Sequence, residues 1–286
     1  MKESSSMSLN TPGTLFVVAT PIGNLDDITI RALSVLKNVD LIAAEDTRYS
    51  YQLLKHYNIH TRMVSLHEYN EDKKSSFILE QLLTGKNIAL ISDAGTPLIS
   101  DPGYRLVAML RNKNINIKVC PIPGPSALIA ALCSSGLPTD RFVFEGFLSP
   151  RKSRQLLQLK QLADETRTMV FYESPHRIVS TITNMTQVFG QKRRAVLAKE
   201  LTKTFETFRS ETLEEIQKWL SNSAENQKGE FVLLVHGEES NSAPIIDKGI
   251  LRIFNILAQE LPKKQALSLT TKITGIKKNS LYDHIF

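Results

Sequence analysis

The chain has 286 residues and a hydrophobic content of 42%, enough for one large or two ordinary domains with buried cores. No apolar run is long enough to cross a bilayer, and Cys120 and Cys133 lie in apolar segments without metal-ligand spacing, so we expect no membrane span, disulfide framework or metal site. Residues 1–13 begin polar and Ser-rich, without the apolar core of a signal peptide, and we expect a disordered tail on a cytoplasmic protein.

The net charge of +6 is unevenly distributed along the chain. Residues 14–123 carry 12 basic and 11 acidic side chains, residues 141–237 carry 15 and 11, and residues 247–286 carry 7 and 3. The basic excess of the second half and the tail suits a phosphate-rich partner, and solvated lysine faces are the plainer alternative.

Strands and helices alternate through the first half. We expect strands at 15–19, 41–44, 63–66, 88–91 and 119–122, and helices at 28–36, 47–56, 75–83 and 104–110. Asp46 or Thr47 is the expected N-cap of the second helix. This alternation predicts βαβ units and a mostly parallel sheet in an N-terminal α/β domain over residues 14–123.

A proline-rich segment, Pro121–Ser126, marks the boundary to a second α/β domain over residues 124–237. We expect strands at 142–144, 168–172, 195–198, 204–209 and 231–235, with antiparallel pairing, and helices at 127–132, 151–163, 175–189 and 212–220. Thr212 and Glu215 have the spacing of a capping box. A linker over 238–248 then leads to a basic helical tail, 249–286, broken at Pro262 and Gly275.

The segment 91–103 follows a predicted buried strand and contains two aspartates, two glycines and two prolines. A simple connector does not need this density of turn residues. Open α/β sheets bind ligands beyond the carboxyl ends of their strands. The segment therefore predicts a ligand-binding loop, with a stiff surface loop as the alternative.

Polar groups also follow other predicted strands, at Glu45–Arg48, Glu173–Arg177 and Lys199–Lys203. A helix cap accounts for part of the first group, and a solvated hairpin tip for the last. His67 stands alone and is more typical of a hydrogen-bonded surface histidine than of a catalyst. The chain lacks both the Gly-x-x-x-x-Gly-Lys-Ser/Thr loop and the Gly-x-Gly-x-x-Gly turn, which argues against a dinucleotide bound in the Rossmann manner.

Six motifs occur in one order over residues 14–237: VATPIGNL (18–25), AEDTR (44–48), SDAGTP (92–97), PGPSA (123–127), ESPHR (173–177) and ELTK (200–203). Together they resemble the tetrapyrrole methylase superfamily, in its branch that methylates ribosomal RNA. The resemblance implies two α/β domains with S-adenosylmethionine in the cleft between them, and a homodimer. It also implies methyl transfer to the ribose 2'-hydroxyl of a decoding-region cytidine in 16S rRNA of the small ribosomal subunit.

The same resemblance implies which residues contact the cofactor: Pro21, Ile22, Asp93, Gly95, Thr96, Ser126, Ala127 and Tyr172. Methylases that act on tetrapyrroles carry a Gly-x-Gly-Pro-Gly first loop. This chain has Ala19-Thr20-Pro21-Ile22-Gly23 instead, which argues against a porphyrin substrate.

A ribose hydroxyl is a poor nucleophile at neutral pH, so we expect a general base. The carboxylate candidates are Glu45, Asp46, Glu173 and Glu200, and Lys199 could lower the pKa of the hydroxyl electrostatically. We expect Arg48, Arg177 and Lys203 to hold phosphates, and Arg151, Lys152 and Arg154 to bind more distant RNA.

Two other functions remain open from the sequence. One is a methyltransferase of the same fold that acts on a tetrapyrrole or a modified protein histidine, for which the basic excess has no obvious use. The other is a non-catalytic factor that binds ribosomes through its basic faces. Cofactor binding distinguishes the second from an enzyme.

Overall fold

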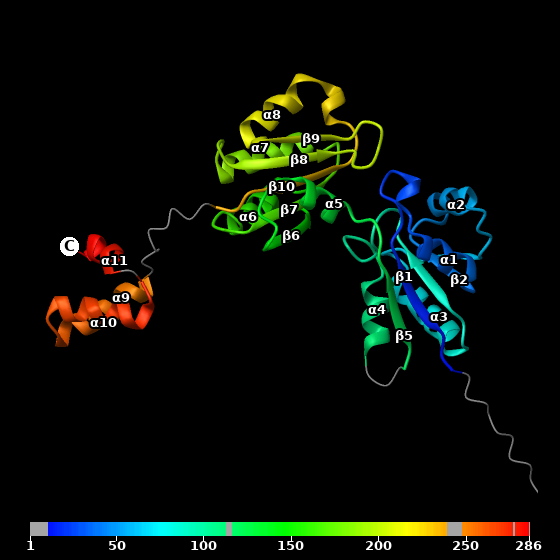
Figure 1. Cartoon of the computed structure of the whole chain (residues 1–286), viewed down its shortest axis with the longest axis horizontal. Helices are drawn as coiled ribbons and strands as arrows, with labels where there is room; N and C mark the ends of the chain where they lie inside the picture. Colours follow the sequence, from blue (N-terminus) through cyan, green and yellow to red (C-terminus); the bar gives the residue numbers. More distant parts are fainter. Residues whose placement is uncertain (1–10, 113–115, 239–247, 277, 286) are drawn as a thin grey trace, which may run out of the picture. The chain divides into compact units, whose positions relative to one another are not determined.

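The computed structural model describes residues 11–112, 116–238, 248–276 and 278–285 (Figure 1). It separates into two compact units, residues 1–237 and residues 238–286. The first unit contains two five-stranded sheets, and the second is helical. Most of the expected N-terminal tail and of the expected linker lies outside the described residues.

The first sheet is parallel throughout, with strand order β3-β2-β4-β1-β5. Its strands are β1 (Thr14–Val18), β2 (Leu41–Ala44), β3 (Met63–Ser65), β4 (Ile88–Ile91) and β5 (Lys118–Ile122). The predicted βαβ alternation is confirmed. The carboxyl ends of β2 and β4, which are neighbours, bring the loops after residues 44 and 91 to one edge of the sheet.

Helices pack on both faces of this sheet because alternate strand residues point to opposite sides. On one face, α1 (Ile30–Asn38) and α2 (Thr47–His56) pack over Ile42 and Ala89. On the other face, α3 (Glu71–Leu83) and α4 (Tyr104–Arg111) pack over Leu41 and Leu90. Figure 1 shows this arrangement.

Two of these helices begin at positions that differ from the sequence prediction. Residues 25–27 form a short 3-10 helix, so α1 begins at Ile30, where the Thr29 side chain accepts a hydrogen bond from Ala32 N. Helix α3 begins at Glu71, four residues early. The buried Glu71 carboxylate accepts hydrogen bonds from the amides of Gly103 and Arg105, a tertiary contact that apolar periodicity does not reveal.

The second sheet is mixed, with order β6-β7-β10-β8-β9 and one parallel pair, β6 with β7. Its strands are β6 (Phe142–Phe147), β7 (Thr168–Glu173), β8 (Arg194–Lys199), β9 (Thr207–Thr212) and β10 (Phe231–Val235). The expected antiparallel pairing of β8 with β9 is confirmed, but β9 lies three residues later than predicted. Residues 200–206 form a tight loop instead, with positive φ at Glu200 and Thr202.

Four helices cover the second sheet. Helix α5 (Ala127–Ser134) packs on one face, and α6 (Lys152–Gln161), α7 (Ile178–Phe189) and α8 (Leu213–Asn222) pack on the other. The predicted capping box of α8 is present. Helix α7 begins three residues after Pro175, because residues 174–177 form a turn in which the Ser174 carbonyl accepts bonds from the amides of Arg177 and Ile178.

The second unit consists of α9 (Lys248–Glu260), α10 (Lys263–Thr274) and α11 (Lys278–Ile285) around a small core that includes Phe254, Leu267 and Leu281. The breaks near Pro262 and at Gly275, which has a φ of 74°, are where the sequence predicted them. Among the helices described in either unit, none is long and apolar enough to span a membrane.

Candidate functional site

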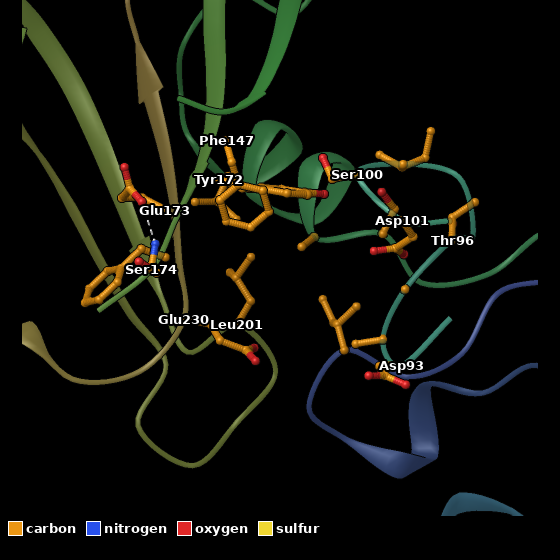
Figure 2. A pocket seen from close by; sticks show the side chains of 18 of the residues that line it. Asp93, Thr96, Ser100, Asp101, Phe147, Tyr172, Glu173, Ser174, Leu201 and Glu230 are labelled. Carbon is orange, nitrogen blue, oxygen red and sulfur yellow. Dashed lines mark hydrogen bonds between the residues drawn. The ribbon is translucent and has the colours of Figure 1, made fainter. Parts of the chain in front are cut away.

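A cavity of about 360 Å³ lies in the first unit, where loops of the first sheet meet the second sheet (Figure 2). Its lining comes from loops after β1, β2 and β4, from the start of α5, and from β6, β7, β10 and the loop after β8. The lining residues are Ile22, Glu45, Asp93, Ala94, Gly95, Thr96, Ile99, Ser100, Asp101, Ser126, Ala127, Phe147, Tyr172, Glu173, Ser174, Pro175, Leu201, Glu230, Phe231 and Val232.

The loop after β4 is anchored to the loop after β1. Thr20 N donates to Gly95 O at 2.9 Å and Gly95 N donates to Thr20 O at 3.0 Å, an isolated antiparallel bridge. Gly95 has a φ of 84°, and Leu98 and Ser100 also have positive φ, at 73° and 69°. Such backbone conformations are costly for residues with side chains and concentrate at functional sites. Residues 93–96 and 99–101 of the segment line the cavity, and their binding of a ligand stays a prediction.

Two half-buried carboxylates stand side by side at this edge of the first sheet. Asp93 Oδ1 accepts a hydrogen bond of 3.0 Å from Asp46 N, and Glu45 Oε2 accepts one of 3.3 Å from Asp93 N. Burial raises the pKa of the Glu45 and Asp93 carboxyls above their ordinary values. The two backbone amides oppose this effect without cancelling it.

Asp101 lies further along the same loop. Burial raises the pKa of its carboxyl to about 6, and the nearby negative charges of Glu45 and Asp93 add to the effect. A hydrogen bond with the Ser92 side chain acts in the opposite direction. This carboxyl therefore exchanges its proton close to neutral pH.

The opposite wall is aromatic and acidic. Tyr172 Oη accepts a hydrogen bond of 3.0 Å from Leu128 N, and its ring meets Phe147 edge-on with 5.6 Å between centroids. Glu173 follows Tyr172 at the end of β7, with its side chain 1% exposed. Its carboxylate accepts hydrogen bonds from Ser174 N at 2.8 Å and from Thr181 Oγ1 at 2.6 Å.

Seven of the eight residues predicted to contact the cofactor line this one cavity, although they come from four separate stretches of the sequence: Ile22, Asp93, Gly95, Thr96, Ser126, Ala127 and Tyr172. The eighth, Pro21, is buried next to Ile22 and is not part of the lining. The contacts themselves remain predictions.

The candidate catalytic residues divide into two groups. Glu45 and Glu173 line the cavity, whereas Asp46, Lys199 and Glu200 do not. Asp46 accepts hydrogen bonds from the Arg48 amide and guanidinium, which lower the pKa of its carboxyl to about 2. Lys199 Nζ donates to the Glu225 carbonyl at 2.7 Å.

Glu200 is held within the loop after β8. Its Oε1 accepts hydrogen bonds from Lys203 Nζ and from Glu230 N, both at 2.9 Å. This loop packs against the first half of the chain, since Asn24 N donates to Thr202 Oγ1 at 3.0 Å. A Cβ on Gly23 would lie 2.8 Å from the Leu201 carbonyl oxygen, so glycine is needed there for the two loops to meet.

The residues expected to bind RNA also differ in their surroundings. Arg151, Lys152 and Arg154 are exposed at the start of α6. The Arg48 side chain is 89% exposed beside Asp46. The remaining two are engaged within the protein: Arg177 donates to the Leu148 carbonyl at 2.6 Å, and Lys203 pairs with Glu200 and Glu230.

Several lining residues were missed by the sequence analysis, chiefly Asp101, Phe147 and Glu230. Asp101 belongs to the segment 91–103, which was predicted to bind a ligand. The available signal for Asp101 was that it is the second aspartate of this segment, after Asp93. Phe147 lies past the predicted end of β6, which a bulge between Phe144 and Gly146 extends. Glu230 directly precedes a buried strand and carried no signal of its own.

The lining has a distinctive charge. It includes five carboxylates, Glu45, Asp93, Asp101, Glu173 and Glu230, and none of the described lining residues is a lysine, arginine or histidine. Apolar side chains, among them Ile22, Leu201 and Val232, supply much of the remaining wall. The cavity thus fits a ligand that carries positive charge and an apolar or aromatic portion.

Comparison with protein-family models gives two matches. Residues 14–217 match the model of Tetrapyrrole (Corrin/Porphyrin) Methylases, and residues 246–285 match the RsmI C-terminal HTH domain. The second match covers almost the whole of the described helical unit.

Close relatives carry one name, ribosomal RNA small subunit methyltransferase I. The protein of that name from Pseudomonas aeruginosa is 50% identical over 271 residues, which cover 94% of this chain and 95% of the relative. The one from Escherichia coli O157:H7 is 46% identical over 284 residues, covering 99% and 98%.

Solved structures share the fold at low sequence identity. Diphthine synthase gives a TM-score of 0.58 at 16% identity, covering 79% of this chain and 90% of that one. Uroporphyrin-III C-methyl transferase from Thermus thermophilus, solved with S-adenyl homocysteine, gives 0.54 at 17% identity, covering 79% and 98%.

Proposed function

The chain belongs to the tetrapyrrole methylase family, in the group named ribosomal RNA small subunit methyltransferase I, and from this premise we propose its reaction. It transfers the methyl group of S-adenosylmethionine to the ribose 2'-hydroxyl of a decoding-region cytidine in 16S ribosomal RNA. The observation that carries the proposal is the acidic cavity, built from residues of several separate loops and strands in a chain with a net charge of +6.

The described lining fits the cofactor. When bound, S-adenosylmethionine supplies an electrophilic methyl group on a cationic sulfonium. Asp93, Glu45 and Asp101 place negative charge at one wall, and the Tyr172 ring offers an aromatic face at the other; both favour a cation. Gly95 and the start of α5 supply backbone amides and carbonyls for polar groups of the ligand.

The acceptor is the less direct part of the proposal. Exposed Arg151, Lys152 and Arg154 lie outside the cavity, so positive charge for phosphates is separated from negative charge for the cofactor. Phosphate contacts orient a nucleic acid, and a nucleotide can then be presented to the cavity. Further basic residues, including Lys264 and Lys272, are exposed on the helical unit.

The protein contributes to this methyl transfer mainly by positioning the cofactor and the acceptor oxygen relative to each other. The rigid edge formed by β2, β4 and the Thr20–Gly95 bridge fixes one wall, and β7 with β10 fixes the other. We further propose that the enzyme acts as a homodimer in the cytoplasm, with the two sheets belonging to domains 14–123 and 124–237.

The test is methyl transfer from labelled S-adenosylmethionine to small ribosomal subunits and, in parallel, to naked 16S RNA. The labelled nucleoside is then identified by mass. We expect a 2'-O-methylcytidine, and none when the acceptor RNA carries 2'-deoxycytidine at that position. Label in a base, in a protein or in an added tetrapyrrole, with none in ribose, would contradict the proposal.

A further inference from the structure

We propose that Asp101 is the general base that accepts the proton of the acceptor hydroxyl. The assignment rests on the proposed methyl transfer to a ribose oxygen. It adds a catalytic residue that neither the sequence motifs nor the names of the relatives indicate.

The loop that carries Asp101 is held against both walls of the cavity. Leu98, Ser100 and Gly103 all have positive φ, so the chain turns sharply on both sides of Asp101. Ser100 Oγ packs against Gly146 of β6, where a Cβ would lie only 3.2 Å from that oxygen. Figure 2 shows Asp101 across the cavity from Glu173. A strained segment fixed at both ends presents a carboxylate in one position.

Each of the other four carboxylates of the lining has a backbone amide or a cationic side chain as a partner. Glu45 and Asp93 each accept a backbone amide. Glu173 accepts an amide and a hydroxyl and lies 3.4 Å from Arg177 Nε. The Glu230 side chain is 72% exposed and is paired with Lys203 at 3.0 Å. Such partners favour the charged form of a carboxylate and so oppose proton uptake, in part at Glu45 and Asp93, where burial still raises the pKa.

Asp101 differs from these four carboxylates in its hydrogen-bond partner and in the charges around it. The partner that the structure gives its carboxyl is a hydroxyl, that of Ser92, and the groups facing it are the Glu45 and Asp93 carboxylates and the Tyr172 phenol. Burial and the like charges raise the pKa of Asp101 to about 6. A base with a pKa just below neutral is mostly ionised at physiological pH and still binds a proton well.

The proposed step balances without another reactant. The carboxylate of Asp101 takes the proton from the acceptor oxygen while that oxygen forms its bond to the methyl carbon. The electron pair of the broken carbon–sulfur bond stays on sulfur, which becomes a neutral thioether. Asp101 then returns the proton to water.

The experiment compares wild type with Asp101→Asn, a change that keeps the shape and removes the basicity. Single-turnover methyl transfer to small subunits is measured from about pH 5 to pH 8, with cofactor affinity measured separately by calorimetry. We expect Asn to slow transfer about 100-fold or more, within the range for a lost general base, and to weaken cofactor binding far less than that. Exposed Asp164, outside the cavity lining, provides the matched control Asp164→Asn.

A second variant tests the assignment through the pH profile. The Ser92 hydroxyl lowers the pKa of Asp101, so Ser92→Ala raises that pKa and moves the acid limb of the rate profile to higher pH. An unmoved limb, or an Asp101→Asn enzyme within about five-fold of wild type, overturns the assignment of Asp101. A wild-type enzyme that labels no ribose instead overturns the proposed function, and the assignment with it.

Discussion

Thr181 Oγ1 donates a hydrogen bond of 2.6 Å to Oε2 of Glu173, and both side chains are buried beside the cavity wall. Since this bond uses the hydroxyl proton, Thr181 can accept from Gln155 Nε2, which lies 2.9 Å away. Asn184 Nδ2 in turn donates to Gln155 Oε1. A chain of buried polar side chains thus links α6, the helix with the exposed basic residues, through α7 to Glu173.

Thr181→Val removes the hydroxyl while keeping the shape of the side chain. We expect it to lower the free energy of unfolding by about 1–3 kcal/mol, because a buried carboxylate oxygen and the Gln155 amide both lose their partner. Urea unfolding measures the change. Thr181→Ser should restore most of the stability. Thr183→Val, the same change at an exposed position of α7, should cost clearly less.

Ionised Asp101 should lower the stability of the folded protein at neutral pH. The same ionised form is the one proposed to act in catalysis, so stability and activity make opposite demands on this residue. Its pKa rises from 3.8 when unfolded to about 6 when folded, so ionisation disfavours folding. The cost is absent below about pH 4, grows between about pH 4 and pH 6, and is complete above that range.

Asp101→Asn should therefore unfold at higher urea concentration than wild type near pH 7.5. We expect a gain of roughly 1 kcal/mol, which allows for screening of a partly exposed group. Near pH 4 the two proteins should differ little. A gain that stays the same at both pH values would show that the side chain acts through packing instead of charge.

The sequence predicted the positions of the strands better than the ends of the polar loops. The strands at 41–44, 88–91 and 231–235 were predicted to the residue, because each is a continuous apolar run buried on both faces. The strand at 207–212 was predicted three residues too early. It contains charged residues, and it follows a loop whose left-handed residues, Glu200 and Thr202, are not glycines and so gave no turn signal.

The same dependence on loop conformation decides which residues of the site could be predicted from the sequence. The family resemblance grouped Ile22, Asp93 and Tyr172, which do line one cavity, but the catalytic candidates included Glu200 and did not include Asp101. Glu200 pairs with Lys203 three residues away, whereas Asp101 lines the cavity in a loop where Leu98 and Ser100 have positive φ. Which way a carboxylate points depends on backbone angles and tertiary contacts that residue types alone do not specify.

Gly95 joins the loops after β1 and β4 in one wall of the cavity, so its substitution should affect ligand binding as well as stability. An added Cβ would lie 3.3 Å from Ile22 Cγ2, at a φ of 84° that alanine tolerates poorly. We expect Gly95→Ala to cost about 1–3 kcal/mol of stability. It should also weaken S-adenosylmethionine binding about ten-fold or more, as measured by calorimetry.

Gly190→Ala is the matched control. Gly190 has a similar φ of 91°, at the end of α7, with nothing within 4 Å of an added Cβ. This variant should lose stability and keep its cofactor affinity. Equal loss of affinity in both variants would indicate that general destabilisation weakens binding and that Gly95 has no special place in the site.

Arg154 and Lys160 lie on the same helix, α6, and both are exposed, but Arg154 is near its start and Lys160 near its end. If the start of α6 meets phosphates, Arg154→Ala weakens RNA binding and flattens its salt dependence. The slope of log K against log salt should fall by about 0.7–0.9, the contribution of one phosphate contact. Filter binding at several salt concentrations gives this slope. Lys160→Ala removes the same charge and should leave the slope unchanged, because a non-specific effect of net charge would alter both variants alike.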